Sequence, residues 1–222
     1  MNKNKILHLL LIVILYSASV QAQGNLPYWN EVQAFKKKDS IQFPSANQIL
    51  FIGSSSFTNW KDVQQYFPSY PILNRAFGGS SLTDLIRYRY DVLFGYQPKQ
   101  IVMYCGENDF AASDTVTVET VLQRFITFFQ LMRAKYKTVP FAYVSMKPSP
   151  SRVHLLPKYI EANNQIKKYL SNKPKTVFID VYHSMLLADG TAMKNIFLSD
   201  SLHMNSKGYA IWKRKIAPYL IK

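Results

Sequence analysis

The sequence predicts an α/β fold in which helices cover both faces of a parallel β-sheet. Short apolar runs, rich in β-branched and aromatic residues, alternate five times with longer stretches of helical periodicity. Runs of this composition are typical of strands that are buried on both faces. The chain has 222 residues, 48% of them hydrophobic, which is enough for one domain with a substantial core.

These periodicities predict the positions of the strands and helices. Strands are expected at residues 48–53, 70–77, 100–106, 139–146 and 175–182. Helices are expected at residues 81–94, 118–136, 157–170 and 206–220. Residues 146–157 contain three prolines, so an irregular loop is expected there. Parallel strands joined by helices require right-handed crossovers.

The first 22 residues have the features of a secretory signal peptide. Lys3 and Lys5 form a short basic region, and residues 6–16 form an apolar run that is short for a membrane span. Small or modest residues, ending at Ala22, then occupy a cleavage-like site. We therefore expect cleavage near Ala22 and export to the periplasm or the cell exterior, without stable membrane insertion. An uncleaved membrane anchor is the alternative. Residues 23–47 are expected to form an N-terminal helical arm, and residues 48–222 the main domain.

The chain is strongly basic, with a formal net charge of +14. Removal of Lys3 and Lys5 subtracts two charges and leaves +12. Such a balance suits an anionic partner, but the basic residues are scattered and no nucleic-acid motif accompanies them. A solvated basic surface is therefore expected, and no nucleic-acid partner. The single cysteine, Cys105, follows an apolar run and is expected to be a buried thiol.

Polar residues follow the expected strands at their carboxyl ends, where open parallel sheets bind ligands. Three serines, Ser54 to Ser56, follow the first strand, and Gly78 and Gly79 follow the second. Asn108 and Asp109 follow the third strand, and Asp200 and His203 precede the last helix. One edge of the sheet is thus expected to bring together a serine, a glycine pair, an asparagine, an aspartate and a histidine.

These residue types are the ones that acyl transfer requires. A serine hydroxyl needs a base to become a nucleophile, and an imidazole with an unperturbed pKa of about 6.5 is suited to that task. An aspartate on the other ring nitrogen fixes the tautomer, and Asp200 lies three residues before His203. Backbone N–H groups of the serine and of Gly79, together with the Asn108 amide, are candidate donors to an oxyanion.

The motifs resemble those of the GDSL-like, or SGNH, hydrolase family over residues 48–220. The first block, "FIGSSSF", aligns the nucleophile of the family with Ser55, and "NRAFGGSS" aligns its oxyanion glycine with Gly79. "GEND" matches the third block and assigns Asn108, while "DSLH" matches the fifth block and assigns Asp200 and His203. The common aspartate before the nucleophile is Ser54 here, a departure that leaves nucleophile and base intact.

The resemblance implies a three-layer αβα sandwich of the flavodoxin-like type, with a five-stranded parallel sheet. It also implies ester hydrolysis by Ser55, His203 and Asp200, with an oxyanion hole formed by Ser55, Gly79 and Asn108. No cofactor and no metal are implied, and no histidine or cysteine cluster has metal-ligand spacing. The sequence predicts no particular oligomeric state.

The expected function is that of an exported serine esterase. Its substrate would be a small-molecule or glycan ester with a short acyl group, such as acetyl. A lysophospholipase or thioesterase is the enzymatic alternative. A non-catalytic basic binding protein on the same fold is the alternative from another class, suggested by the charge and by Ser54.

The location or role of four further polar residues can also be predicted. His154 lies in the proline-rich loop and is a candidate substrate contact, with an exposed loop position as the alternative. His183 is expected to be structural. Asp109 is expected to stabilise its turn rather than to serve as the triad acid. Glu107 is expected to face outward or to line the rim of the site.

Overall fold

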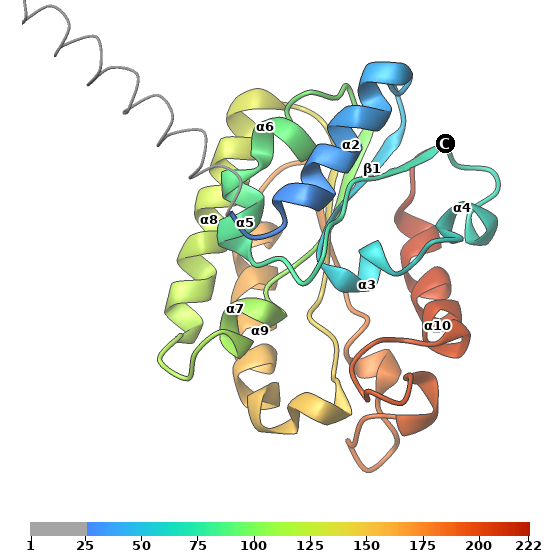
Figure 1. The fold of residues 1–222 in the computed structure, drawn as a ribbon. Coiled ribbons are helices and arrows are strands. Elements are labelled where there is room, and N and C mark those ends of the chain that lie inside the picture. Colours follow the sequence, from blue (N-terminus) through green and yellow to red (C-terminus); the bar gives the residue numbers. More distant parts are fainter. Residues whose placement is uncertain (1–25) are drawn as a thin grey trace, which may run out of the picture.

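Five parallel strands form the centre of the molecule, in the order β2-β1-β3-β4-β5 (Figure 1). The computed structural model describes residues 26–222, so the expected signal peptide lies outside the described residues. The strands are β1 (Ile49–Gly53), β2 (Ile72–Asn74), β3 (Gln100–Tyr104), β4 (Phe141–Val144) and β5 (Thr176–Ile179). This order and direction confirm the predicted parallel sheet.

Helices cover both faces of the sheet and complete the predicted three layers (Figure 1). On one face lie α2 (Trp29–Ile41), α5 (Leu82–Arg87), α6 (Arg89–Val92), α7 (Glu107–Ala111), α8 (Val118–Lys135) and α9 (Leu156–Ser171). On the other face lie α3 (Ser55–Thr58), α4 (Val63–Tyr66) and α10 (Ser206–Ile216). Four short 3₁₀ helices complete the described chain, η1 (Pro150–Leu155), η2 (His183–Met185), η3 (Lys194–Ile196) and η4 (Ala217–Tyr219).

The burial of the strands follows their place in the sheet. Every residue of β1, β3 and β4 is buried, because these strands have a neighbour on each side and helices on both faces. The edge strand β2 is half-buried throughout, and β5 is buried only at Ile179. The hydrophobic runs therefore predict the central strands best.

Three sequence-based expectations differ in detail from the structure. The helix expected at residues 81–94 is divided into α5 and α6, which meet at Tyr88. The loop expected at residues 146–157 contains η1, which is kinked at Arg152 (φ −120°, ψ 28°). The strand expected at residues 70–77 is paired as β2 only over Ile72–Asn74, although its later residues still bond to β1.

The N-terminal arm packs directly on the main domain. Val32 of α2 is fully buried in the same hydrophobic cluster as α5, α8 and one face of β1. An ion pair joins Asp39 to Arg75, and the hydroxyl of Tyr96 donates to Asp39 as well. The boundary expected at residue 48 remains a prediction, since α2 shares its core with the sheet.

Glycines end the two strands that lead into the site. Gly53 ends β1 with a φ of 135°, and Gly106 follows β3 with a φ of 129°. A Cβ atom on Gly53 would lie 1.8 Å from the carbonyl oxygen of Tyr104. Only glycine fits this close approach of two backbones. Both strands can therefore turn sharply into short helices at the same edge of the sheet.

Candidate active site

Ser55 is the first residue of α3 and follows the sharp turn at Gly53. Its neighbours Ser54 and Ser56 are 2% and 1% exposed, whereas Ser55 is partly exposed. The N–H of Ser54 donates to the carbonyl of Tyr104 at 3.0 Å, which fixes the turn to β3. Of the three consecutive serines, Ser55 is thus the one that is accessible to solvent.

Asp200 and His203 form one tight turn next to Ser55. The Nδ1 atom of His203 lies 2.6 Å from Oδ2 of Asp200, and its Nε2 atom lies 3.1 Å from Oγ of Ser55. The other oxygen of Asp200 accepts the backbone N–H groups of Leu202 and His203, both at 2.9 Å. Ser201, between them, has the left-handed backbone (φ 56°) that closes the turn. The structure therefore joins three predicted residues in one hydrogen-bonded chain.

These hydrogen bonds determine the charge of Asp200. Partial desolvation raises the pKa of this carboxyl group, but the bonds from the His203 side chain and from the N–H groups of His203 and Leu202 outweigh it. They lower the pKa of Asp200 from 3.8 to about 2. Asp200 is consequently an ionised acceptor for the imidazole over the whole neutral pH range.

Two of the expected oxyanion donors, Gly79 and Asn108, lie next to each other. Asn108 Nδ2 is 3.6 Å from the position that a Cβ atom on Gly79 would occupy. The same Nδ2 atom donates to the carbonyl of Ser80 at 3.2 Å, and Oδ1 of Asn108 accepts from Arg152 at 2.9 Å. Within the described residues, the N–H groups of Ser55 and Gly79 make no hydrogen bond to the protein. They are therefore available to a ligand.

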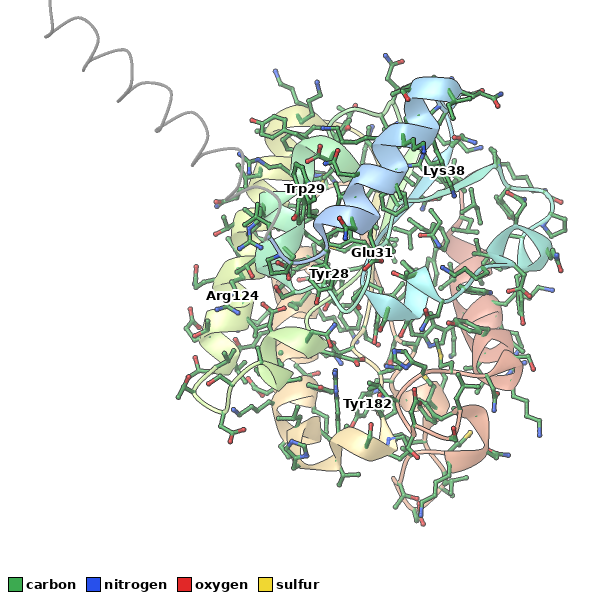
Figure 2. All side chains as sticks on the ribbon, viewed as in Figure 1. Tyr28, Trp29, Glu31, Lys38, Arg124 and Tyr182 are labelled. Atoms are coloured by element: carbon green, nitrogen blue, oxygen red, sulfur yellow. The ribbon has the colours of Figure 1, made fainter. Side chains whose placement is uncertain are left out.

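Two residues of the N-terminal arm contact the glycine pair. Oε2 of Glu31 accepts the N–H of Gly78 at 2.8 Å. The ring of Tyr28 lies 2.5 Å from the position of a Cβ atom on Gly78, and its hydroxyl 3.7 Å from that on Gly79. Figure 2 shows Tyr28 and Glu31 at the lower end of α2. The sequence alone did not indicate that either residue belongs to the site.

Glu107 is buried, and the expectation that it faces outward or lines the rim was wrong. Its side chain is 5% exposed and lies 3.1 Å from Nζ of Lys147, which is 2% exposed. Its Oε1 atom also accepts the N–H of Lys147 at 2.9 Å and the hydroxyl of Tyr104. Burial lowers the pKa of Lys147, and the charge of Glu107 partly offsets this effect. The carboxylate is tolerated inside the protein because it is paired and hydrogen-bonded.

The hydrogen-bond partners of Asp109 also differ from those expected, because they lie outside its own turn. It accepts the N–H of Leu82, at the start of α5, at 2.9 Å and pairs with Arg124 of α8 at 2.8 Å. Figure 2 shows Arg124 on α8. Desolvation raises the pKa of Asp109, and the contacts to Leu82 and Arg124 partly offset this effect. Asp109 thus joins helices instead of stabilising only its own turn.

The remaining candidates lie outside the hydrogen-bonded chain. His154 is exposed on η1, and no bond from its side chain is present in the described part of the chain. His183 is exposed, and its Nδ1 atom lies 2.6 Å from Oδ2 of Asp180. Cys105 is fully buried, as expected, and burial raises the pKa of its thiol. Among residues 26–222, no cluster of histidine, cysteine and acidic side chains could hold a metal ion.

The fold and this edge of the sheet define the class of the protein, an α/β protein with a serine–histidine–aspartate chain at the carboxyl ends of parallel strands. The model of the GDSL-like lipase/acylhydrolase family matches residues 47–211, and the chain belongs to this family. The resemblance seen in the motifs is thereby confirmed. No curated protein matches the chain significantly.

Solved structures with the same fold cover most of the chain. A candidate platelet activating factor from Streptococcus pneumoniae is 22% identical, with a TM-score of 0.76 over 92% of this chain and 99% of that one. A GDSL-like lipase from Bacteroides thetaiotaomicron is 18% identical, with a TM-score of 0.72 over 85% and 96%. A mutant acetyl-xylooligosaccharide esterase from Geobacillus stearothermophilus is 13% identical, with a TM-score of 0.62 over 80% and 96%. These TM-scores establish a common fold.

Residues 26–222 include no helix with the length and hydropathy needed to span a bilayer.

Proposed function

We propose that this protein is an exported serine esterase that hydrolyses short acyl esters, above all acetyl esters, on carbohydrates. Ser55 is the nucleophile, His203 the general base and acid, and Asp200 the residue that orients His203. The backbone N–H groups of Ser55 and Gly79 and the amide of Asn108 stabilise the oxyanion. The observation that supports this proposal most strongly is the continuous chain of contacts from Ser55 through His203 to Asp200, at 3.1 and 2.6 Å.

In the first half of the reaction, the Ser55 oxygen attacks the ester carbonyl carbon while His203 Nε2 takes its proton. The resulting imidazolium keeps its Nδ1 proton in a hydrogen bond to ionised Asp200. The oxyanion accepts from the three donors, each of which typically contributes about 10²–10³-fold to kcat. The bond to the alcohol oxygen then breaks, and His203 returns the proton to that oxygen.

In the second half, water replaces the alcohol. His203 removes a proton from the water as its oxygen attacks the acyl-serine carbonyl, and the same three donors hold the second oxyanion. The bond to Ser55 Oγ breaks, and the serine regains its proton from His203. One ester and one water are consumed, and one alcohol and one carboxylic acid are formed. No other reactant is needed.

The substrate class has two lines of support. The structural neighbours include an esterase described as acting on acetyl-xylooligosaccharides. The connections from β1 to α3 and from β3 to α7 are also too short to hold a lipid-binding lid. A short acyl group on a sugar hydroxyl needs no such lid. Export is proposed from the sequence of the first 22 residues.

A single substitution tests the mechanism. Ser55→Ala is expected to abolish p-nitrophenyl acetate hydrolysis while it leaves the thermal unfolding midpoint near that of the wild type. Ser56→Ala is the matched control, because it removes the same hydroxyl group from a buried neighbour, and it should remain active. Full turnover by Ser55→Ala would refute the assignment of the nucleophile.

The acyl preference is tested with p-nitrophenyl esters of increasing chain length, next to acetylated xylan and a lysophospholipid. We expect kcat/KM to be highest for acetate and to fall with chain length, and we expect acetate to be released from the glycan. A maximum at eight or more carbons, or hydrolysis of the lysophospholipid alone, would favour the alternative enzyme class.

A further inference from the structure

Residues 147–152 connect the two halves of the candidate site. The segment begins at buried Lys147 and ends at Arg152, within η1. The N–H and the hydroxyl of Ser151 both donate to the carbonyl oxygen of Ser201, each at 3.1 Å. Ser201 lies inside the turn that carries the histidine and the aspartate. The C-terminal end of the segment is therefore attached to the acid–base half of the site.

Arg152, the next residue, attaches the same end to the oxyanion half. Its Nη2 atom donates to Oδ1 of Asn108 at 2.9 Å, and its Nη1 atom lies 3.5 Å from Oε2 of Glu107. The side chain is only 17% exposed. The guanidinium group is thus held between a buried carboxylate and the amide of the neighbouring residue.

The contact with Arg152, together with the Ser80 carbonyl, determines which end of the Asn108 amide faces the oxyanion. An amide group has a donor end and an acceptor end, and a rotation by 180° exchanges them. A guanidinium group has only donors, so it can bind Oδ1 but not Nδ2. With Oδ1 on Arg152, Nδ2 faces the Ser80 carbonyl and the Gly79 side of the site. In the reversed orientation, an oxygen would face the developing negative charge.

The support for Arg152 is itself rigid. Glu107 is held by the ammonium group and the N–H of Lys147 and by the hydroxyl of Tyr104. These groups are buried, so their mutual attraction is stronger than it would be in water. The arginine therefore has a fixed position from which to orient the amide.

We infer that Arg152 is a positioning residue of the oxyanion hole, which acts on the reaction by fixing the Asn108 amide with Nδ2 directed at the oxyanion. This inference rests on the proposed function, because Asn108 must be an oxyanion donor for its orientation to affect the rate. It adds a residue that lies 44 positions from Asn108 and belongs to none of the family blocks found in the sequence.

A double-mutant cycle tests the inference. kcat and KM for p-nitrophenyl acetate are measured for the wild type, Arg152→Ala, Asn108→Ala and the double variant. Arg152→Ala is expected to lower kcat about tenfold or more, the size of a lost charge-assisted hydrogen bond, with little change in KM. Asn108→Ala is expected to lower kcat by about 10²–10³-fold. In the Asn108→Ala background, removal of Arg152 should cost nothing further, because its target is gone.

Two further variants separate positioning from stability. Arg133→Ala removes a partly buried arginine whose donors bind carbonyls at Tyr136, Val139, Pro174 and Lys175, before β4 and β5 at the opposite edge of the sheet. It should lower the unfolding midpoint without lowering kcat of the folded protein. Arg152→Lys keeps a cationic donor near Asn108 and should recover part of the lost kcat, and it serves as the readout if Arg152→Ala does not fold.

Additive losses in the double variant would overturn the inference, because Arg152 would then act on the transition state directly and not through Asn108. An unchanged kcat in Arg152→Ala would overturn it as well. Ser55→Ala is measured in parallel. If Ser55→Ala is inactive and the cycle is additive, the inference alone fails. If Ser55→Ala retains full turnover, the proposed function fails and the inference with it.

Discussion

The carboxylate of Glu31 accepts a hydrogen bond from the N–H of Gly78 at 2.8 Å, across 47 positions of sequence. Glu31 belongs to α2, whereas Gly78 adjoins the candidate oxyanion donor Gly79. The N-terminal arm thus contacts the part of the chain that must remain fixed during acyl transfer. The arm therefore supports the proposed site as well as the sheet.

Glu31→Ala is expected to lower kcat for p-nitrophenyl acetate a few-fold, because the turn at Gly78 loses its external acceptor. Glu31 is exposed, so the free energy of unfolding should change by no more than about 1 kcal/mol. Glu31→Gln keeps an acceptor oxygen and should retain most of kcat. Lys37→Ala, an exposed change on the same helix, is the control. Equal kcat values in the wild type and the three variants would show that the N-terminal arm does not support the site.

The buried pair of Glu107 and Lys147 predicts a strongly asymmetric response to substitution. Lys147→Met leaves the Glu107 carboxylate buried without its closest cation, and it should lower the free energy of unfolding by roughly 3–5 kcal/mol. The double variant Glu107→Gln/Lys147→Met removes both charges and should recover most of that loss. Urea denaturation measures both effects. A double variant less stable than Lys147→Met would contradict the pairing.

Asp109 is predicted to contribute to stability and not to the chemistry. Asp109→Ala leaves the buried N–H of Leu82 unpaired and Arg124 without its partner, so the free energy of unfolding should fall by roughly 1–3 kcal/mol. The kcat of the folded variant should stay within a few-fold of the wild type. Active-site titration with a fluorophosphonate corrects for the folded fraction. A loss of 10³-fold or more per folded molecule would make Asp109 part of the catalytic machinery.

Asp200→Asn tests the electrostatics of the triad. The variant should lose up to about 10⁴-fold in kcat, because an amide can hold the wrong tautomer of His203. The carboxyl pKa of Asp200 is about 2 in the folded protein, below its ordinary value of 3.8. Its contribution to stability is therefore present above about pH 4 and is lost as pH falls toward about 2.

Asp200→Asn lacks the contribution that the Asp200 carboxylate makes to the stability of the wild type. The difference in unfolding midpoint between wild type and variant should consequently be constant above about pH 4 and should shrink as the pH falls to about 2. Thermal unfolding in a series of buffers measures it. A difference that grows on acidification would mean that the carboxylate is not held by these hydrogen bonds.

The sheet could be predicted from the sequence because its central strands are buried on both faces and must be apolar throughout. The edge strand β2 was less predictable. The chain beyond β2 still donates to β1, from Arg75 to Phe51 and from Phe77 to Gly53, so its composition resembles that of a strand. Regular strand pairing with β1 nevertheless ends at Asn74.

The proposed triad could be located because each member follows a strand or precedes a helix within a short motif. Its supporting residues could not. Arg152, Lys147 and Glu107 are charged, and composition alone assigns such residues to the surface. Their burial depends on partners that are 40 or more positions away in the sequence. Glu31 was missed for the same reason, since the arm's contact with Gly78 is entirely tertiary.

Ser55 is the residue that is proposed to carry the acyl group. Incubation with a fluorophosphonate, followed by proteolysis and peptide mass mapping, tests it most directly, because the buried hydroxyls of Ser54 and Ser56 provide internal controls. One stoichiometric adduct on Ser55 is expected, formed in the wild type and absent from Ser55→Ala. A folded wild-type protein that remains unlabelled, or an adduct on any other serine, would contradict it.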